Sequence, residues 1–417
     1  MFKKEILENQ RKIRELNLIK RNIDLAEIED VFKLNKIISF IWSRRAWKTF
    51  LTFQVVKEFC DRKIIELENV VYIDFSWILN KDLDLEFIED SYFELFPDKK
   101  PFFIFDEIQE LNNFSEKLIK ILNKWYKILI TWSNAHLLSK EISTILRWKV
   151  YTKEIFPLDF KEYLKFKNIA FSKEDLILNK AKYKFEFTNF LKWGWFPEIV
   201  LTENQIVREN ILKSYFDVMI YKDLQDRYKI KNDFALNFFI KRVLTTYTKE
   251  LNINKIYNEL KSLEVKIWKD SLYNFYEYLH NIYLIEPLDN FWSKIKWLKK
   301  NYLIDVSFAN LIWNDDFWQR FENFVFFELR KIYSEIYFLN KNYEIDFFLP
   351  SENKFIQVVY NLTFDNLERE TKKLLKQQWE KILIYFEKEK GVFVDERIKF
   401  VNFSEIFLSW DSVLTTR

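Results

Sequence analysis

Residues 42–49 have the residue types and spacing of a loop that binds phosphate, except at two positions. The segment reads Trp42-Ser43-Arg44-Arg45-Ala46-Trp47-Lys48-Thr49. With glycine at 42 and 47 it would match G-x-x-x-x-G-K-T, in which backbone N–H groups surround phosphate oxygens. Such a loop needs positive φ angles and close backbone approach, which glycine allows and tryptophan does not. We therefore expect residues 42–49 to bind a nucleotide if positions 42 and 47 are glycine.

The composition supports glycine at these positions. The 417 residues include 2 Gly and 15 Trp, whereas a chain of this length ordinarily has about 29 Gly. Reading tryptophan as glycine would bring the glycine content close to the ordinary share. Our hypothesis is that UGA codons, which some bacterial lineages decode as glycine, have been translated here as tryptophan at many or all of these positions.

Two acids at the end of an apolar run supply the second part of a phosphate site. Asp106 and Glu107 follow the apolar residues Phe102–Phe105, the pattern of a Walker B strand. We expect Asp106 and the Thr49 hydroxyl to bind Mg²⁺, and Lys48 to contact the β- and γ-phosphates. Glu107 would act as the general base that orients the attacking water. Strands often end in acids, so the prediction depends on the preceding loop.

Two further polar segments are candidates for contact with the γ-phosphate. Ser133 and Asn134 follow another apolar run, and either could position the attacking water; alternatively, they cap a helix that begins at Ala135. Arg147 could present a cation to a phosphate of its own subunit or of a neighbouring one. A surface salt bridge is the alternative role for Arg147.

Hydrophobic patterning places these residues in an α/β region. Short apolar runs alternate with helical stretches between about residues 34 and 160, which predicts βαβ units and a mainly parallel sheet. An amphipathic helix is expected after the loop, at Thr49–Asp61. The expected strands are Lys36–Ile41, Val70–Phe75, Phe102–Phe105, Lys127–Thr131 and Lys149–Ile155.

Several segments together resemble the AAA-type P-loop ATPases of bacteria and archaea that carry a characteristic C-terminal domain of unknown function. Besides the motifs above, they are Leu146–Lys149, Phe156–Tyr163 (the family's P-L-x-F-x-E-Y-like signature), Trp193–Glu198 (G-G-F-P-E), Tyr221–Tyr228, Phe321–Val325 and Glu344–Phe347. Tryptophan stands where the family has glycine at positions 42, 47, 132, 148 and 195. The resemblance implies ATP binding, hydrolysis, and an ASCE-type sheet with an extra strand between the P-loop strand and the Walker B strand.

The expected organisation is an α/β protein with several parts. They are an N-terminal helical segment (1–33), an AAA-like ATPase domain (34–160), a helical region (161–250), a winged-helix-like module (251–300) and a mixed α/β, restriction-nuclease-like domain (301–417).

The C-terminal half offers candidates for binding, and its nuclease chemistry is expected to be absent. Metal-dependent nucleases of this kind need acids for Mg²⁺ and a lysine near the attacking water. Glu328 and Asp346 could supply acids, but Gln357 and Val359 stand where a further acid and the lysine would be. Alternatively, Glu322 and Glu328 have a structural role.

Duplex DNA is a possible partner of the winged-helix-like module. The lysines that could contact its phosphates are Lys266, Lys269, Lys294, Lys296, Lys299 and Lys300. The alternative is a helical packing module with solvated lysines, and the formal net charge of only +3 argues against a strongly polyanion-seeking protein.

Composition narrows the remaining classes of function. One cysteine excludes an internal disulfide and a cysteine-based zinc site, and two widely separated histidines argue against a histidine-rich metal site. No apolar run reaches about 18 residues, so we expect a cytoplasmic protein without membrane contact. The leading function is an Mg²⁺-dependent ATPase that acts as a molecular switch on a protein or nucleic-acid partner, with a homo-oligomer as one candidate assembly. The alternative is a non-enzymatic DNA-binding or regulatory protein with a structural or inactive nucleotide site.

The recoding hypothesis predicts UGA codons at the tryptophan positions of the coding DNA, including 42 and 47. The intact mass of the native protein should then be lower by one Trp-to-Gly difference at each recoded site. Native peptides that contain tryptophan at both 42 and 47 would refute this interpretation.

Overall fold

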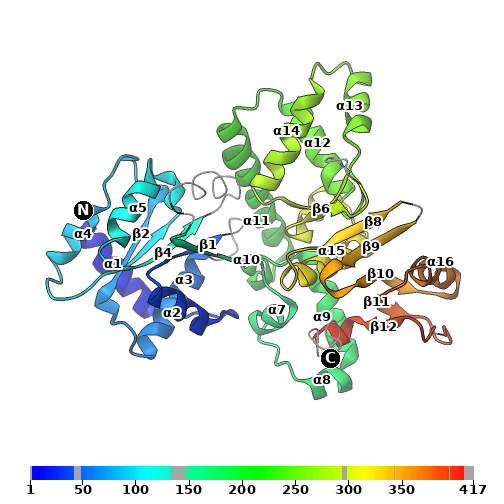
Figure 1. Ribbon diagram of the computed structural model, residues 1–417, viewed down its shortest axis with the longest axis horizontal. Helices are drawn as coiled ribbons and strands as arrows, with labels where there is room; N and C mark the ends of the chain where they lie inside the picture. Colours follow the sequence, from blue (N-terminus) through cyan, green and yellow to red (C-terminus); the bar gives the residue numbers. More distant parts are fainter. Residues whose placement is uncertain are drawn as a thin grey trace. The chain divides into compact units, whose positions relative to one another are not determined.

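The computed structural model describes residues 2–41, 48–132, 146, 148–293, 298–341, 343–393 and 395–407. The chain forms two compact units (Figure 1). The N-terminal unit is Met1–Leu158 together with Asn281–Tyr283, and the C-terminal unit is Asp159–His280 together with Leu284–Arg417.

The N-terminal unit contains a five-stranded parallel sheet. Its strands are β1 (Ile37–Ile41), β2 (Val70–Asp74), β3 (Phe102–Asp106), β4 (Lys127–Trp132) and β5 (Val150–Glu154). They lie in the order β2-β3-β4-β1-β5, and every pair is parallel. The predicted strands are confirmed to within about a residue at each end, and β4 is the expected extra strand between β1 and β3.

Helices cover both faces of this sheet because its central strands are apolar on both sides. One face packs on α1 (Phe2–Glu15), α4 (Glu86–Phe93) and α5 (Phe114–Leu122), whose apolar side chains join alternate strand residues in one core. On the other face, Phe32 of α2 (Leu25–Lys33) contacts Phe102 edge-on at 5.4 Å. Phe53 of α3 (Lys48–Asp61) contacts Tyr72 at 4.9 Å.

The first part of the C-terminal unit is helical, as expected for residues 161–250. Its helices are α7 (Phe160–Phe166), α8 (Lys173–Leu178), α9 (Lys180–Trp193), α10 (Pro197–Leu201), α11 (Gln205–Val218), α12 (Asp233–Thr245), α13 (Ile253–Ser262) and α14 (Lys269–Asn281). A π-helical turn, Met219–Asp226, continues α11. Helices α13 and α14 lie in the segment 251–300, for which a winged-helix-like module is predicted.

A seven-stranded mixed sheet forms the rest of this unit. Its strands are β6 (Ile285–Asn290), β7 (Lys299–Leu303), β8 (Tyr337–Asn340), β9 (Glu344–Leu349), β10 (Lys354–Leu362), β11 (Glu380–Lys388) and β12 (Lys399–Asn402). Their order is β12-β11-β10-β9-β8-β6-β7. Helix α15 (Phe317–Arg330) packs on β10 and β7, and α16 (Phe364–Leu375) packs on β10 and β11. This architecture confirms the predicted C-terminal mixed α/β region.

The end of α9 is fixed by a close contact between Gly194 and a buried acid. Gly194 has a φ of +81°, and a Cβ there would lie 1.8 Å from Oδ1 of Asp305. Asp305 accepts hydrogen bonds from the backbone N–H groups of Trp195 (2.6 Å) and Ser307 (2.8 Å). Burial raises the pKa of Asp305 to about 6. Glycine is therefore required at 194 both by conformation and by space.

Arg320 of α15 holds the same helix end from another side. It is fully buried and donates hydrogen bonds to the carbonyl oxygens of Leu191 (3.0 Å) and Lys192 (2.9 Å). These carbonyls belong to the last turn of α9, where no intrahelical donors remain. A buried guanidinium supplies both the donors and a charge that favours this end of the helix dipole.

Replacing Gly194 by alanine should destabilise the protein strongly. We expect Gly194→Ala to lower the free energy of unfolding by about 3–5 kcal/mol, because the methyl group displaces Asp305 and strains the backbone. Chemical denaturation followed by circular dichroism measures this.

Gly391→Ala is the matched control. Gly391 also has a positive φ, +86°, but among the described residues a Cβ there would meet only the Phe364 ring, at 3.4 Å. Its expected cost is about 1 kcal/mol, from backbone strain alone. Equal losses in the two variants would contradict the role assigned to Asp305.

Candidate functional site

A buried carboxylate, Asp106, is the centre of the candidate site in the N-terminal unit. Asp106 is the last residue of β3 and is 3% exposed. It accepts hydrogen bonds from the hydroxyl groups of Thr49 (2.5 Å), Tyr72 (2.7 Å) and Thr131. Three hydroxyls from different elements therefore converge on one acid.

The parallel topology explains why these residues meet. Carboxyl ends of parallel strands lie at the same edge of a sheet, where open α/β sheets bind their ligands. Asp106 and Thr131 come from the ends of the neighbouring strands β3 and β4, and Tyr72 comes from β2. Thr49 is the second residue of α3, whose first residue, Lys48, is buried.

Opposing effects act on the pKa of Asp106. Burial raises the pKa of Asp106, and the neighbouring negative charge of Glu107 raises it further; the hydrogen bonds from Thr131, Thr49 and Tyr72 lower it. Hydroxyl donors favour the charged form of a carboxylate. The site therefore holds a desolvated acid that a nearby cation would stabilise as a carboxylate.

Glu107 has a strained backbone. Its φ is +52° and its ψ is +46°, in the left-handed region, which is uncommon for a residue other than glycine. Its backbone N–H donates to Oγ1 of Thr131 at 3.1 Å, and its carboxylate accepts a hydrogen bond from the side-chain amide of Gln109. Strain of this kind concentrates at functional sites.

The structure brings some predicted residues together and adds two that the sequence did not single out. Thr49 and Asp106, the two predicted metal ligands, are hydrogen-bonded to each other, and Glu107 follows Asp106 in the chain. Tyr72 and Thr131 were missed, and the available signal was a hydroxyl residue near the end of a strand. The predicted residues outside the described parts of the chain are Trp42, Ser43, Arg44, Arg45, Ala46, Trp47, Ser133, Asn134 and Arg147.

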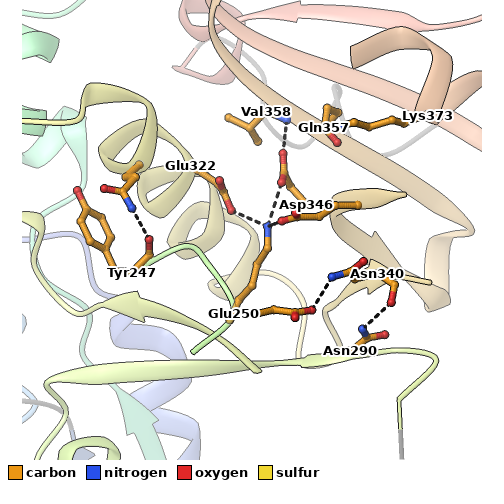
Figure 2. Close-up of polar contacts among 12 residues, drawn as sticks. Tyr247, Glu250, Asn290, Glu322, Asn340, Asp346, Gln357, Val358 and Lys373 are labelled. Carbon is orange, nitrogen blue, oxygen red and sulfur yellow. Dashed lines mark hydrogen bonds and ion pairs between the residues drawn. The ribbon is translucent and has the colours of Figure 1, made fainter. Parts of the chain in front are cut away.

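A second group of buried charges lies in the C-terminal unit, and it corrects one expectation. Asp346 shares Lys300 with Glu322, not with Glu328 (Figure 2). Glu328 instead pairs with Lys331 at 2.6 Å. Both glutamates lie on α15, but six residues apart, so the rotation of the helix directs them differently.

The lysines proposed for DNA binding differ in exposure and in their ion-pair partners. Lys300 is 1% exposed and bound by acids, so it cannot contact phosphates. Lys299 forms an ion pair with Asp289 at 3.0 Å, and Lys294 and Lys296 lie outside the described residues. The remaining two flank the start of α14: Lys266 is exposed, and Lys269 is the first residue of the helix.

Comparison with known proteins assigns the two parts of the chain. Residues 34–164 match the model of an AAA domain, and residues 184–316 match that of a domain of unknown function, DUF8612. The AAA match covers the parallel sheet and the Asp106 site. The chain therefore combines a segment that matches an AAA domain with a following segment that matches a domain of unknown function.

The chain is similar to other proteins over most of its length. It is 35% identical over 384 residues to the uncharacterized protein MJ1544 of Methanocaldococcus jannaschii, which covers 89% of this chain and 84% of the relative. It is 27% identical over 369 residues to an uncharacterized protein of Haemophilus influenzae, covering 84% and 88%. The chain belongs to the same family as MJ1544.

Solved structures are more distant. The Orc1 protein of Aeropyrum pernix in complex with DNA is 10% identical, with a TM-score of 0.34, covering 74% of this chain and 97% of that one. AMPPCP-bound DnaA of Aquifex aeolicus is 13% identical, with a TM-score of 0.29, covering 61% and 85%. Neither similarity carries a conclusion about ligands or partners. Among the helices that the structure describes, none is long and apolar enough to cross a membrane.

Removing the Tyr72 hydroxyl should destabilise the N-terminal unit. Tyr72→Phe deletes a hydrogen bond to a buried carboxylate, so we expect a loss of about 1.5–3 kcal/mol in the free energy of unfolding. Denaturant titration at neutral pH measures it.

Tyr247→Phe is a suitable control because the Tyr247 hydroxyl is buried and has no hydrogen-bond partner within the described part of the chain. Its removal should cost little or even stabilise the protein. The assignment fails if Tyr72→Phe is no more destabilising than Tyr247→Phe.

Proposed function

We propose that this protein is an Mg²⁺-dependent ATPase whose phosphate loop has glycine at positions 42 and 47. The observation that carries the proposal is the hydrogen bond between Thr49 and Asp106. It joins the start of the helix after the loop to the end of β3, in a sheet where β4 separates β1 from β3. The match of residues 34–164 to an AAA domain supports the same reading.

The residues around Asp106 fit a magnesium ion. Mg²⁺ prefers oxygen ligands and is often bound by one or two protein groups together with substrate phosphates. Thr49 and Asp106 supply a hydroxyl and a carboxylate, and the burial that raises the pKa of Asp106 would be offset by a cation. When bound, Mg²⁺ would neutralise charge on the β- and γ-phosphates.

The chain's own residues have distinct roles in the proposed reaction. Lys48 and the N-terminus of α3 attract the phosphates through their positive charge. Glu107 orients the attacking water and accepts its proton, and Thr131 holds the backbone of Glu107 in place. Asn134 and Arg147 are proposed to contact the γ-phosphate.

Exposure of tryptophan side chains supports the recoding hypothesis. Tryptophan is large and usually well buried. Among the described residues, seven tryptophans are exposed: Trp77, Trp125, Trp148, Trp268, Trp292, Trp313 and Trp379. Such exposure of a large aromatic ring is unusual, whereas glycine at loop and turn positions is ordinary.

Backbone geometry supports the hypothesis independently. Trp313 has a φ of +58° directly after the helical segment Val306–Ile312, and Trp125 has a φ of +64° in the turn after α5, where its N–H donates to the carbonyl oxygen of Leu122. Helices commonly end with a left-handed glycine at such a position, and a bulky residue there is a clear outlier. The buried indole N–H groups of Trp132 and Trp195 have no hydrogen-bond partner in the described structure, which is costly for tryptophan and does not arise with glycine.

DNA binding by the C-terminal unit is the second candidate function. A cavity of about 420 Å³ lies beside the start of α14, and it is lined by basic and aromatic residues that include Lys231, Lys266, Tyr228 and Tyr278. The two tyrosine rings are stacked with centroids 3.6 Å apart. Lysines contact phosphates, and aromatic rings stack on bases, so this face suits a nucleic-acid partner of the ATPase.

The ATPase proposal predicts the effect of two substitutions in the protein that has glycine in place of tryptophan at positions 42 and 47. Lys48→Ala should abolish measurable ATP turnover because phosphate charge is no longer neutralised. Glu107→Gln should lower kcat by about 10²–10⁴-fold while ATP still binds. Phosphate release under saturating Mg²⁺-ATP measures both.

Glu116→Gln, an exposed position on α5, is the control and should retain full turnover. Tryptophan at 42 and 47 should weaken ATP binding, since the indole occupies space needed by phosphate. Unchanged turnover in both Lys48→Ala and Glu107→Gln would refute the proposal. A steep salt dependence of duplex DNA binding in that case would favour the non-enzymatic function.

A further inference from the structure

Three acids surround one buried ammonium group in the C-terminal unit. Lys300 of β7 is 1% exposed. Its Nζ lies 3.1 Å from Oε1 of Glu322 and 3.0 Å from Oδ1 of Asp346, which point toward it from α15 and β9 (Figure 2). It also lies 2.7 Å from Oε1 of Glu344. Each proton of the ammonium therefore has a carboxylate acceptor.

Neighbouring groups fix these acids in position. The Tyr302 hydroxyl donates to Oε1 of Glu322 at 3.0 Å, and the backbone N–H of Val358 donates to Oδ2 of Asp346 at 2.9 Å. Strands β7, β9 and β10 and helix α15 thus contribute to one cluster. Burial, and after it the negative charge of Asp346, raise the pKa of Glu322 to about 8.

Gln357 carries a buried amide on β10, next to the strand that holds Asp346. The antiparallel ladder between β9 and β10 ends at the pair Phe347 and Ile356, and Gln357 is the residue of β10 that follows this pair. Gln357 is 4% exposed and donates through Nε2 to Glu370 at 3.1 Å. Its Oε1 has no hydrogen-bond partner among the described residues.

The three acids supply oxygen atoms of the kind that a hard divalent cation prefers. Carboxylate and amide oxygens bind Mg²⁺ and Mn²⁺. With Lys300 in place, however, no group of His, Cys, Asp and Glu residues in the described parts of the chain is arranged to hold a metal ion. The acids are spaced for hydrogen bonds to an ammonium.

We propose that Lys300 occupies the position of a divalent cation in a latent metal site formed by Glu322, Asp346 and Glu344. The lysine supplies from β7 a positive charge that the acids require. The cluster then holds the C-terminal unit together without a metal ion. Removing the ammonium while leaving the acids converts the cluster into a site for Mn²⁺ or Mg²⁺.

Full-length Lys300→Met tests this proposal. Methionine keeps much of the side-chain volume without charge, so the three acids lose their cation and the melting temperature should fall in metal-free buffer. MnCl₂ at about 100 times its dissociation constant should then raise the melting temperature by about 5 °C or more. The full-length wild type should show no rise of this size.

Lys300→Met/Asp346→Asn is the matched control, and it should show no rise beyond that of the wild type. Any Mn²⁺ bound at Asp106 is common to the three proteins and cancels in the comparison. Equal shifts in all three proteins, or none in Lys300→Met, would overturn the proposal.

Two further measurements, of folding and of nuclease activity, also test the proposal for Lys300. If Lys300→Met does not fold in metal-free buffer, Mn²⁺ must restore its circular dichroism spectrum while the double variant stays unfolded; failure of Mn²⁺ to do so refutes the proposal. Cleavage of duplex DNA by the wild type with Mg²⁺, lost in Lys300→Met, would make Lys300 part of a working nuclease and would also refute it.

Discussion

Burial of the Asp106 carboxylate is the constraint on which the N-terminal unit depends. A desolvated acid is costly unless hydrogen bonds or a cation compensate for it, and here hydroxyls from β2, β4 and α3 provide the hydrogen bonds. Those contacts hold the start of the helix after the phosphate loop against the edge of the sheet. The hydrogen bonds to Asp106 therefore both stabilise the fold and position the residues of the candidate site.

The C-terminal unit solves a similar problem with an internal cation. Glu322, Asp346 and Glu344 approach one another closely enough to repel, and Lys300 compensates for them. Breaking a buried ion pair by removing one partner is far more damaging than never having had it. The two units thus compensate for buried carboxylates differently: hydroxyl groups surround Asp106, whereas the Lys300 ammonium pairs with Glu322 and Asp346.

Some positions of the chain require the backbone conformation that glycine adopts readily. Gly194 shows how strictly one position can require a residue without Cβ, because Asp305 fills the space that a Cβ would take. Left-handed backbone at Trp125 and Trp313 imposes a related conformational demand where the sequence has tryptophan.

The sequence by itself determined the local features: the strands, the helix after the loop, and the pairs Lys48-Thr49 and Asp106-Glu107. These follow from apolar periodicity and adjacent residues, which act over a few positions of chain. Only the tertiary structure decided that Tyr72 and Thr131 bind Asp106, that Glu322 rather than Glu328 meets Asp346, and that Lys300 is buried. Such contacts depend on strand order, register and helix rotation, which bring together residues that are distant in the sequence.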